Sequence, residues 1–144
     1  MAALPFCHAE IRFPKPKSTA YPRIIKTLGD HLRKRRLDLG LLQKQVADQI
    51  GVDELTATNW ERNATVPAIR HIPAIIRFLG YDPLPSANSL PERLVAARRG
   101  LGLSQRKMAE KLGVDPATIK NWEAGRHQPT GKSVDLIGKI VSIR

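Results

Sequence analysis

The stretch Gly113-Val-Asp-Pro-Ala-Thr-Ile-Lys-Asn-Trp-Glu123 decides the fold, because it joins a glycine turn, an aspartate cap and a short helix. Glycine readily adopts the left-handed backbone that ends a helix, and Asp115 followed by proline is a strong start signal for the next one. At helical spacing, Ile119 and Trp122 share an apolar side. The open side carries Pro116, Ala117, Thr118, Lys120 and Asn121. We therefore predict a short helix with one buried side and one polar side.

An earlier stretch, Gly51–Glu61, repeats this arrangement. A shift of 62 residues aligns residues 28–67 with 90–129 without a gap, and sixteen of the forty positions are identical. Both glycine turns and both Asn-Trp-Glu segments are kept, so the chain holds a duplicated domain rather than helices of similar composition. We predict a first unit at residues 26–80 and a second unit at 89–144. A proline-rich linker at 81–88 separates them, and an extended basic tail at 1–25 precedes them.

Each unit carries the start and stop signals of four helices. The first helix follows a capping box, Thr27–Asp30 in the first unit and Ser89–Glu92 in the second, and it closes at Gly40 or Gly102. The fourth helix follows a proline and has an apolar run, which we expect Pro73 to disturb in the first unit. The sequence thus predicts an all-α protein built from two tandem four-helix units.

The net charge of +11 over 144 residues is large, and it concerns partners rather than fold. A positive field favours a polyanion such as nucleic acid, and an anionic membrane surface is the rival. No apolar run approaches the ~20 residues that span a bilayer, and no signal-peptide core is evident. The single Cys7 excludes an intrachain disulfide and a cysteine-based zinc cluster. We expect a cytoplasmic protein, associated with the nucleoid if the source is bacterial.

The repeated pattern has the form Gln-x-x-hydrophobic-Ala-x-x-hydrophobic-Gly-hydrophobic-x-x-x-Thr-x-x-x-Trp-Glu. It runs from Gln43 to Glu61 and again from Gln105 to Glu123. This pattern resembles the helix-turn-helix domain of the phage repressor and Cro family, also called XRE-like. The resemblance implies a lambda-repressor-like fold, double-stranded DNA as partner, and a third helix that lies in the major groove. The family commonly binds as two-fold dimers, so a homodimer or another protein partner is one expectation. The alternative is that the two units on one chain take the place of that dimer.

By this resemblance, DNA meets the third helix, the start of the second helix and the loop beyond the third. The chemistry of the side chains fits, because Asn59 and Asn121 suit adenine, and Lys120 suits guanine. The second helix opens with a glutamine at an N-terminus that points at a phosphate. The predicted set comprises Gln105, Arg106, Pro116, Ala117, Thr118, Lys120, Asn121, Arg126 and His127 in the second unit, and Gln43, Lys44, Thr56, Thr58 and Asn59 in the first.

A second set of repeated residues has a structural interpretation. Each tryptophan could stack on bases, but its helical spacing places it on the inner face, so we expect a core residue. The resemblance pairs an arginine late in the first helix with the glutamate that ends the third, whereas the alternative for each arginine is a phosphate contact. The structural set is Trp60, Trp122, Arg36, Arg98, Glu61 and Glu123.

No arrangement of side chains in the sequence predicts catalysis. There is no glycine-rich phosphate loop or paired-carboxylate motif, and Cys7 has no base arranged to activate it. The four histidines lack metal-ligand spacing. We therefore predict neither an enzyme nor a cofactor or metal site.

The two units are unequal in sequence. Ser104 can cap the second helix of the second unit where the first unit has Leu42, and Glu54 places a carboxylate at a base-facing position. We expect the second unit to be the principal reader of DNA in a transcriptional regulator. One alternative is a protein-interaction or antitoxin-like module in which the first unit binds the partner, which Leu55 favours. Another is a non-specific architectural DNA binder, which only the charge favours.

Overall fold

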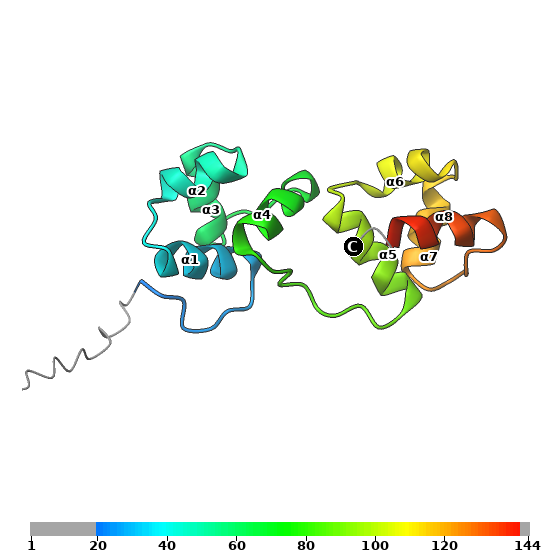
Figure 1. Ribbon diagram of the computed structural model, residues 1–144, viewed down its shortest axis with the longest axis horizontal. Helices are drawn as coiled ribbons and strands as arrows, with labels where there is room; N and C mark the ends of the chain where they lie inside the picture. Colours follow the sequence, from blue (N-terminus) through cyan, green and yellow to red (C-terminus); the bar gives the residue numbers. More distant parts are fainter. Residues whose placement is uncertain (1–19, 142–144) are drawn as a thin grey trace, which may run out of the picture.

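A computed structural model describes residues 20–141, and within that range the chain forms α-helices, one short 3-10 turn and no strand (Figure 1). The predicted all-α fold of two tandem four-helix units is thereby confirmed. Most of the expected basic tail, including Cys7, lies outside the described residues. The elements are α1 (Leu28–Asp38), α2 (Gln43–Ile50), α3 (Glu54–Glu61), η1 (Ile69–His71), α4 (Ile72–Leu79), α5 (Leu90–Gly100), α6 (Gln105–Leu112), α7 (Pro116–Glu123) and α8 (Lys132–Val141).

Each unit encloses a hydrophobic core of its own. Five positions of the two cores correspond in the duplication, and burial of each large apolar side chain contributes about 1.5–3 kcal/mol. Both tryptophans belong to this set, with 3% of Trp60 and 7% of Trp122 exposed. The first core contains Leu32, Val46, Ile50, Trp60, Ile75, Phe78 and Leu79, and the second contains Leu94, Met108, Ala109, Leu112, Ile119, Trp122 and Ile137.

The turn between the second and third helices has a left-handed glycine and an aspartate cap in both units. Gly51 and Gly113 adopt left-handed backbone, with φ of 82° and 65°. The carboxylate of Asp53 then accepts from the backbone N–H of Thr56 at 2.8 Å, and Asp115 accepts from that of Ala117 at 2.7 Å. An aspartate at this position satisfies a backbone donor that the helix leaves open. Turn and cap together set α3 against α2 and α7 against α6.

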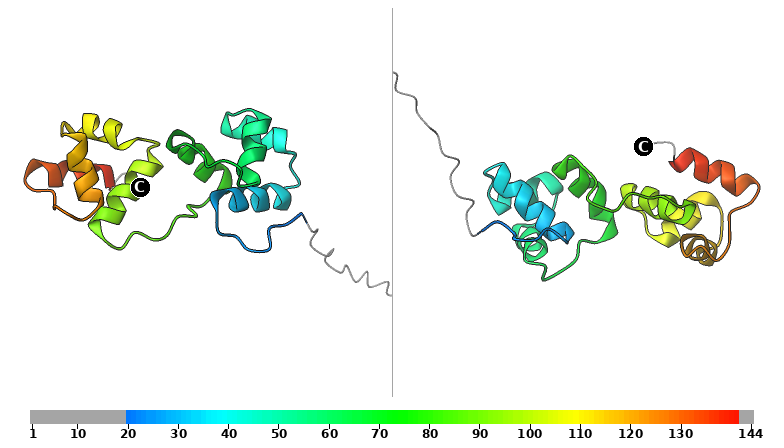
Figure 2. Two further views of the ribbon diagram at one scale, coloured as in Figure 1. Left: turned by 180° about the vertical axis from the view of Figure 1, so that it is seen from behind. Right: turned by 90° about the horizontal axis from the view of Figure 1, so that it is seen from below.

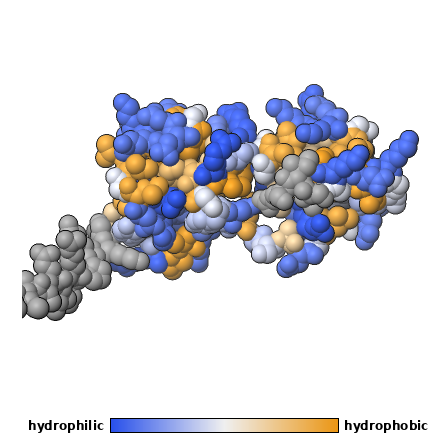
Figure 3. Space-filling model, viewed as in Figure 1, coloured by the Kyte–Doolittle hydropathy of each residue, from blue (hydrophilic) through white to orange (hydrophobic). Residues whose placement is uncertain are grey.

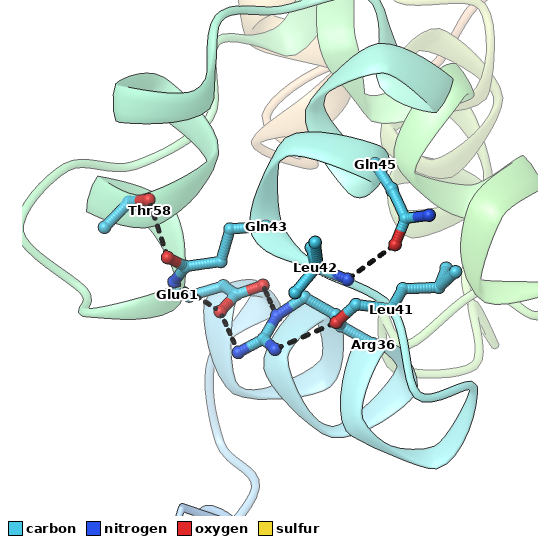
Figure 4. Close-up of polar contacts among 7 residues, drawn as sticks. All are labelled: Arg36, Leu41, Leu42, Gln43, Gln45, Thr58 and Glu61. Carbon is cyan, nitrogen blue, oxygen red and sulfur yellow. Dashed lines mark hydrogen bonds and ion pairs between the residues drawn. The ribbon is translucent and has the colours of Figure 1, made fainter.

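The helix starts differ as the sequence indicates. Ser104 Oγ accepts from the backbone N–H of Lys107 at 3.2 Å, whereas Leu42 offers no side-chain cap to α2. Instead, Gln45 Oε1 reaches back to the N–H of Leu42 at 2.8 Å (Figure 4). The fourth helix of the first unit is divided between His71, which ends η1, and Ile72, which begins α4. Pro73 lies in the first turn of α4, where its missing N–H costs little.

The two units contact each other through α4 and α5 (Figure 1). Gly102, just after α5, lies so close to α4 that a Cβ built on it would come within 3.1 Å of Pro73 Cγ. The linker is also anchored at its start, because the hydroxyl of Tyr81 lies 2.8 Å from Nδ1 of His31 on α1. Further along, Leu84–Ala87 and the surface of α5 around Val95 line one shallow pocket.

Hydrophilic residues cover the upper part of both units on the face shown in Figure 3, where α2 and α6 lie, and apolar residues are exposed below them.

Between residues 20 and 141, no helix is both long and apolar enough to cross a membrane.

Candidate DNA interface

The predicted reading helices α3 and α7 lie on the same side of the molecule. Seen from behind (Figure 2, left), both face the viewer, with α2 and α6 above them and α1 and α5 below. On α7, Pro116, Ala117 and Lys120 are exposed and Asn121 is half-buried. The structure therefore brings the predicted second-unit helix residues to one open surface.

The side chains at the centre of this surface are available to a partner. Among residues 20–141, neither Lys120 nor Asn121 has a side-chain hydrogen-bond partner, whereas the backbone of α7 is fixed at both ends. The backbone N–H of Arg126 donates to the carbonyl of Asn121 at 2.9 Å, which holds the loop that follows α7. Arg126 and His127 are both exposed in that loop, and His127 also lines a small pocket over Trp122.

An ion pair at the end of each reading helix braces it against the first helix of its unit. Arg98 Nη2 donates to Glu123 Oε2 at 3.0 Å, and 10% of the arginine side chain and 6% of the glutamate side chain are exposed. The equivalent bond joins Arg36 Nη2 to Glu61 Oε2 at 2.8 Å (Figure 4). Both arginines also donate to a backbone carbonyl, that of Leu103 or Leu41. A paired, nearly buried guanidinium of this kind is structural, and it is turned away from a phosphate partner.

The glutamine that opens the second helix is bound to the same glutamate in both units. Gln105 Nε2 donates to Glu123 Oε2 at 2.8 Å, and Gln43 Nε2 donates to Glu61 Oε2 at 3.1 Å. The buried ion pair thus orients a residue of the predicted DNA-binding set.

The two glutamines differ in whether the carbonyl oxygen of the side chain has a partner. The carbonyl of Gln43 accepts a 3.1 Å bond from the hydroxyl of Thr58 on α3, so both of its polar atoms have partners inside the first unit (Figure 4). In the second unit the counterpart of Thr58 is Lys120, which projects into solvent. Gln105 therefore keeps its carbonyl oxygen available, whereas the carbonyl oxygen of Gln43 already has one of its two acceptor positions filled by Thr58.

Two other predicted contacts already have partners. The hydroxyl of Thr56 donates to the capping carboxylate of Asp53 at 2.6 Å. Arg106 Nε donates to Glu110 at 3.0 Å, but 81% of the arginine side chain is exposed, and an exposed pair of this kind is worth only a few tenths of a kcal/mol. Arg106 can therefore exchange its carboxylate for a phosphate at small cost. Lys44, its counterpart in the first unit, is exposed.

A cationic pocket in the first unit was not predicted from the sequence. Arg33 and Arg62 line it together with Arg36, Gln43 and Glu61. Neither Arg33 nor Arg62 belongs to the DNA-binding set that the sequence predicts. The signal was present in the repeat, because Val95 and Ala124 stand at these positions in the second unit.

The loop after α3 is tied to α1 by Asn63. Its Oδ1 accepts from the hydroxyl of Thr27 at 2.6 Å, and its Nδ2 donates to Asp30 at 3.0 Å. Burial would raise the pKa of Asp30, but the bonds from Asn63 and from the backbone of Thr27 and Lys26 outweigh it and lower this pKa to about 2. Gly125 is the counterpart of Asn63. The same loop in the second unit therefore lacks this tie.

No group of three or more histidine, cysteine or acidic side chains within residues 20–141 is arranged to hold a metal ion. What the described residues present instead is an exposed polar helix in each unit, set at a fixed angle by a glycine turn and held by a buried ion pair. This is the architecture of a helix-turn-helix protein.

Residues 32–85 and 94–140 both match the helix-turn-helix family model. Because these segments make up more than half of the chain, the protein belongs to this family, in its XRE-type branch, whose domains bind double-stranded DNA. The first matched segment covers most of the first unit and runs into the linker, and the second lies within the second unit, so the family assignment holds for each copy.

Two curated proteins are similar to part of the chain. The HTH-type transcriptional regulator DicA of Escherichia coli (strain K12) is 30% identical over 53 residues, which are 37% of this chain and 39% of that protein. The type II methyltransferase M1.ScrFI of Lactococcus lactis subsp. cremoris is 28% identical over 74 residues, which are 49% of this chain and 19% of that protein. The chain thus spans well under half of either relative. No solved structure gives a significant match.

Proposed function

We propose that this protein is a sequence-specific transcriptional regulator whose second unit reads the major groove with α7. The carrying observation is the open surface of α7, where Lys120 and Asn121 have no side-chain partner among the described residues while a buried ion pair fixes the helix behind them. Because the helix backbone is already fixed, binding has to order only these side chains and not the segment that carries them. The similarity to the transcriptional regulator DicA supports regulation as the role.

The base contacts follow from side-chain chemistry. Asn121 can bind adenine through the oxygen and the nitrogen of its side-chain amide, and Lys120 can donate to O6 and N7 of guanine. Ala117 is small enough to meet a thymine methyl group. The carbonyl of Gln105 adds an acceptor beside them. Each good pairing with a base contributes about 1–3 kcal/mol of discrimination.

Phosphate contacts would come from the cations around this surface. Arg106 and Arg126 flank α7 in the second unit, and Lys44, Arg33 and Arg62 lie near the corresponding surface in the first unit. Such contacts fix the register of the protein on the duplex without reading its sequence. On this account the first unit contributes more to affinity than to sequence discrimination.

A specific observation favours a second candidate, in which the first unit binds a protein. Leu42 and Leu55 are 69% and 68% exposed at the start of α2 and α3, and Glu54 adds a carboxylate to the surface that would face phosphate. Exposed leucines beside a carboxylate suit a protein partner better than a polyanion. In this candidate the second unit binds DNA alone.

Salt dependence of binding tests the DNA binding that both candidates require. Fluorescence anisotropy with a pool of random duplexes should give an affinity that falls about 10³-fold between 50 and 200 mM salt, because six or more phosphates release counterions. Lys120→Ala should weaken binding, whereas Lys139→Ala is the matched control on α8, which is turned away from α7 (Figure 2, right). If the pool is not bound even at low salt, the proposal of DNA binding is wrong.

A further inference from the structure

The contact between the units joins two helices that are not equivalent in the duplication. α4 is the fourth helix of the first unit, and its partner α5 is the first helix of the second unit. In a two-fold pair every contact occurs twice, so a contact of α4 with α5 would require one of α1 with α8. α1 and α8 instead lie well apart along the molecule in Figures 1 and 2. The units are therefore packed head to tail.

The reading helices have the same sense in this arrangement. Each runs from the turn after its second helix to the ion pair with its first helix. In Figure 2, left, both second helices are at the top and both first helices are at the bottom, so α3 and α7 descend alike on the face toward the viewer. A two-fold dimer would present these helices in opposite senses.

Comparing Gly102 with its counterpart Gly40 shows how closely the two units are packed. It has φ of +67° and lies against Pro73 Cγ and the carbonyl of Arg70, at 3.1 and 3.3 Å from the position of a Cβ. Its counterpart Gly40 has the same backbone, with φ of +66°, but nothing lies within 4 Å of a Cβ there. The left-handed backbone favours glycine at both positions. Close packing against the first unit occurs only at Gly102.

We propose that the chain binds two half-sites arranged as a direct repeat, in the same orientation on one face of the duplex, and not the inverted repeat that a two-fold dimer requires. The proposal rests on DNA binding by both units. Helices that share one face of the protein reach one face of the duplex, so the half-sites lie about one helical turn, ~10 bp, apart.

The two half-sites are related but not identical. Asn59 and Asn121 are the same residue in both reading helices, which conserves an adenine contact. Thr58 stands where the second unit has Lys120, which removes a donor to guanine, and Leu55 in place of alanine enlarges the apolar contact with a thymine methyl. The operator is therefore an imperfect direct repeat.

The test uses the full chain and duplexes built from the sequence that it enriches from a random pool. The enriched half-sites are synthesised as a direct repeat, as an inverted repeat, and as a direct repeat lengthened by half a turn. We expect the direct repeat to bind at least about tenfold more tightly than the other two, because only there do both units bind one duplex at once. Equal or tighter binding of the inverted repeat, or of a single half-site, would overturn the direct repeat and leave DNA binding intact. Failure to enrich any motif would instead overturn sequence-specific DNA binding itself.

A matched pair of variants tests the origin of the orientation. Asparagine tolerates left-handed backbone, so Gly102→Asn and Gly40→Asn impose similar local strain and differ in the contact with Pro73. With helical content checked by circular dichroism, Gly102→Asn should lose most of the preference for the direct repeat, and Gly40→Asn should keep it. If both variants keep it, the α4–α5 contact does not set the orientation and the inference fails.

Discussion

Replacing Glu123 with glutamine leaves the volume of the side chain unchanged but removes the charge that balances Arg98. In the native protein, 6% of the Glu123 side chain is exposed, and it accepts from Arg98 at 3.0 Å and from Gln105 at 2.8 Å. Arg98 is itself nearly buried, so the substitution leaves a guanidinium inside the protein with no counter-charge. Breaking a buried pair from one side costs about 3–5 kcal/mol.

This loss is large compared with the stability of a small unit. Whole domains are stable by about 5–15 kcal/mol, and a four-helix unit of this length should lie at the low end. Glu123→Gln should therefore bring the second unit close to its unfolding midpoint in water while the first unit stays folded. The matched control is Glu110→Gln, which breaks the ion pair with Arg106 at 61–81% exposure and should cost no more than about 0.5 kcal/mol.

Urea unfolding followed by the fluorescence of Trp122, in a Trp60→Phe background, measures the second unit separately. A loss for Glu123→Gln no larger than that for Glu110→Gln would refute the argument. The double substitution of Arg98 and Glu123 with methionine tests the cause, because replacing both charges with apolar side chains removes the desolvation penalty and should restore most of the stability. If the double variant is as unstable as the single one, desolvation is not the reason.

Four further outcomes follow from individual contacts. Ser104→Ala removes a helix cap and should lower the free energy of unfolding by about 1 kcal/mol, whereas Leu42→Ser supplies the missing cap and should raise it, both measured by urea unfolding. The pKa of Asp30 is lowered from 3.8 to about 2, so its stabilising effect is present above pH 4 and is lost as the pH falls toward 2. Asp30→Asn should therefore flatten the decline of the melting temperature of the first unit between pH 4 and 2. Arg62→Ala should reduce the slope of log affinity against log salt by about one, without changing base preference.

The helices and their caps could be predicted because their signals are local in the sequence. A capping box needs residues three apart, and a left-handed glycine after an apolar run needs only its neighbours, so Ser89 and Gly113 were interpretable without the fold. The buried side of α7 followed from helical spacing, which places Ile119 and Trp122 in the core. Pro73 likewise indicated that the fourth helix is disturbed, and α4 begins one residue before it, at Ile72.

The contacts that make the two units different could not be predicted in this way. The bond from Thr58 to Gln43 joins residues 15 positions apart, and it depends on the angle between α2 and α3. The bond from the N–H of Leu42 to Gln45 joins residues that are close in sequence, but it depends on the rotamer of Gln45. The packing of Gly102 against Pro73 depends on how the linker places the units. Contacts of this kind are set by tertiary distances, which a helical pattern does not encode.

The most direct test of sequence-specific reading by α7 is a selection from random double-stranded DNA, carried out in parallel with the native chain and with Asn121→Ala. The account predicts that the native chain enriches a defined motif. It also predicts that the variant enriches the same motif with its preference lost at one position, an adenine, because the half-buried Asn121 side chain has no hydrogen-bond partner among the described residues and does not hold the fold. Enrichment of no motif by the native chain, or of an unchanged motif by Asn121→Ala, would contradict the central claim.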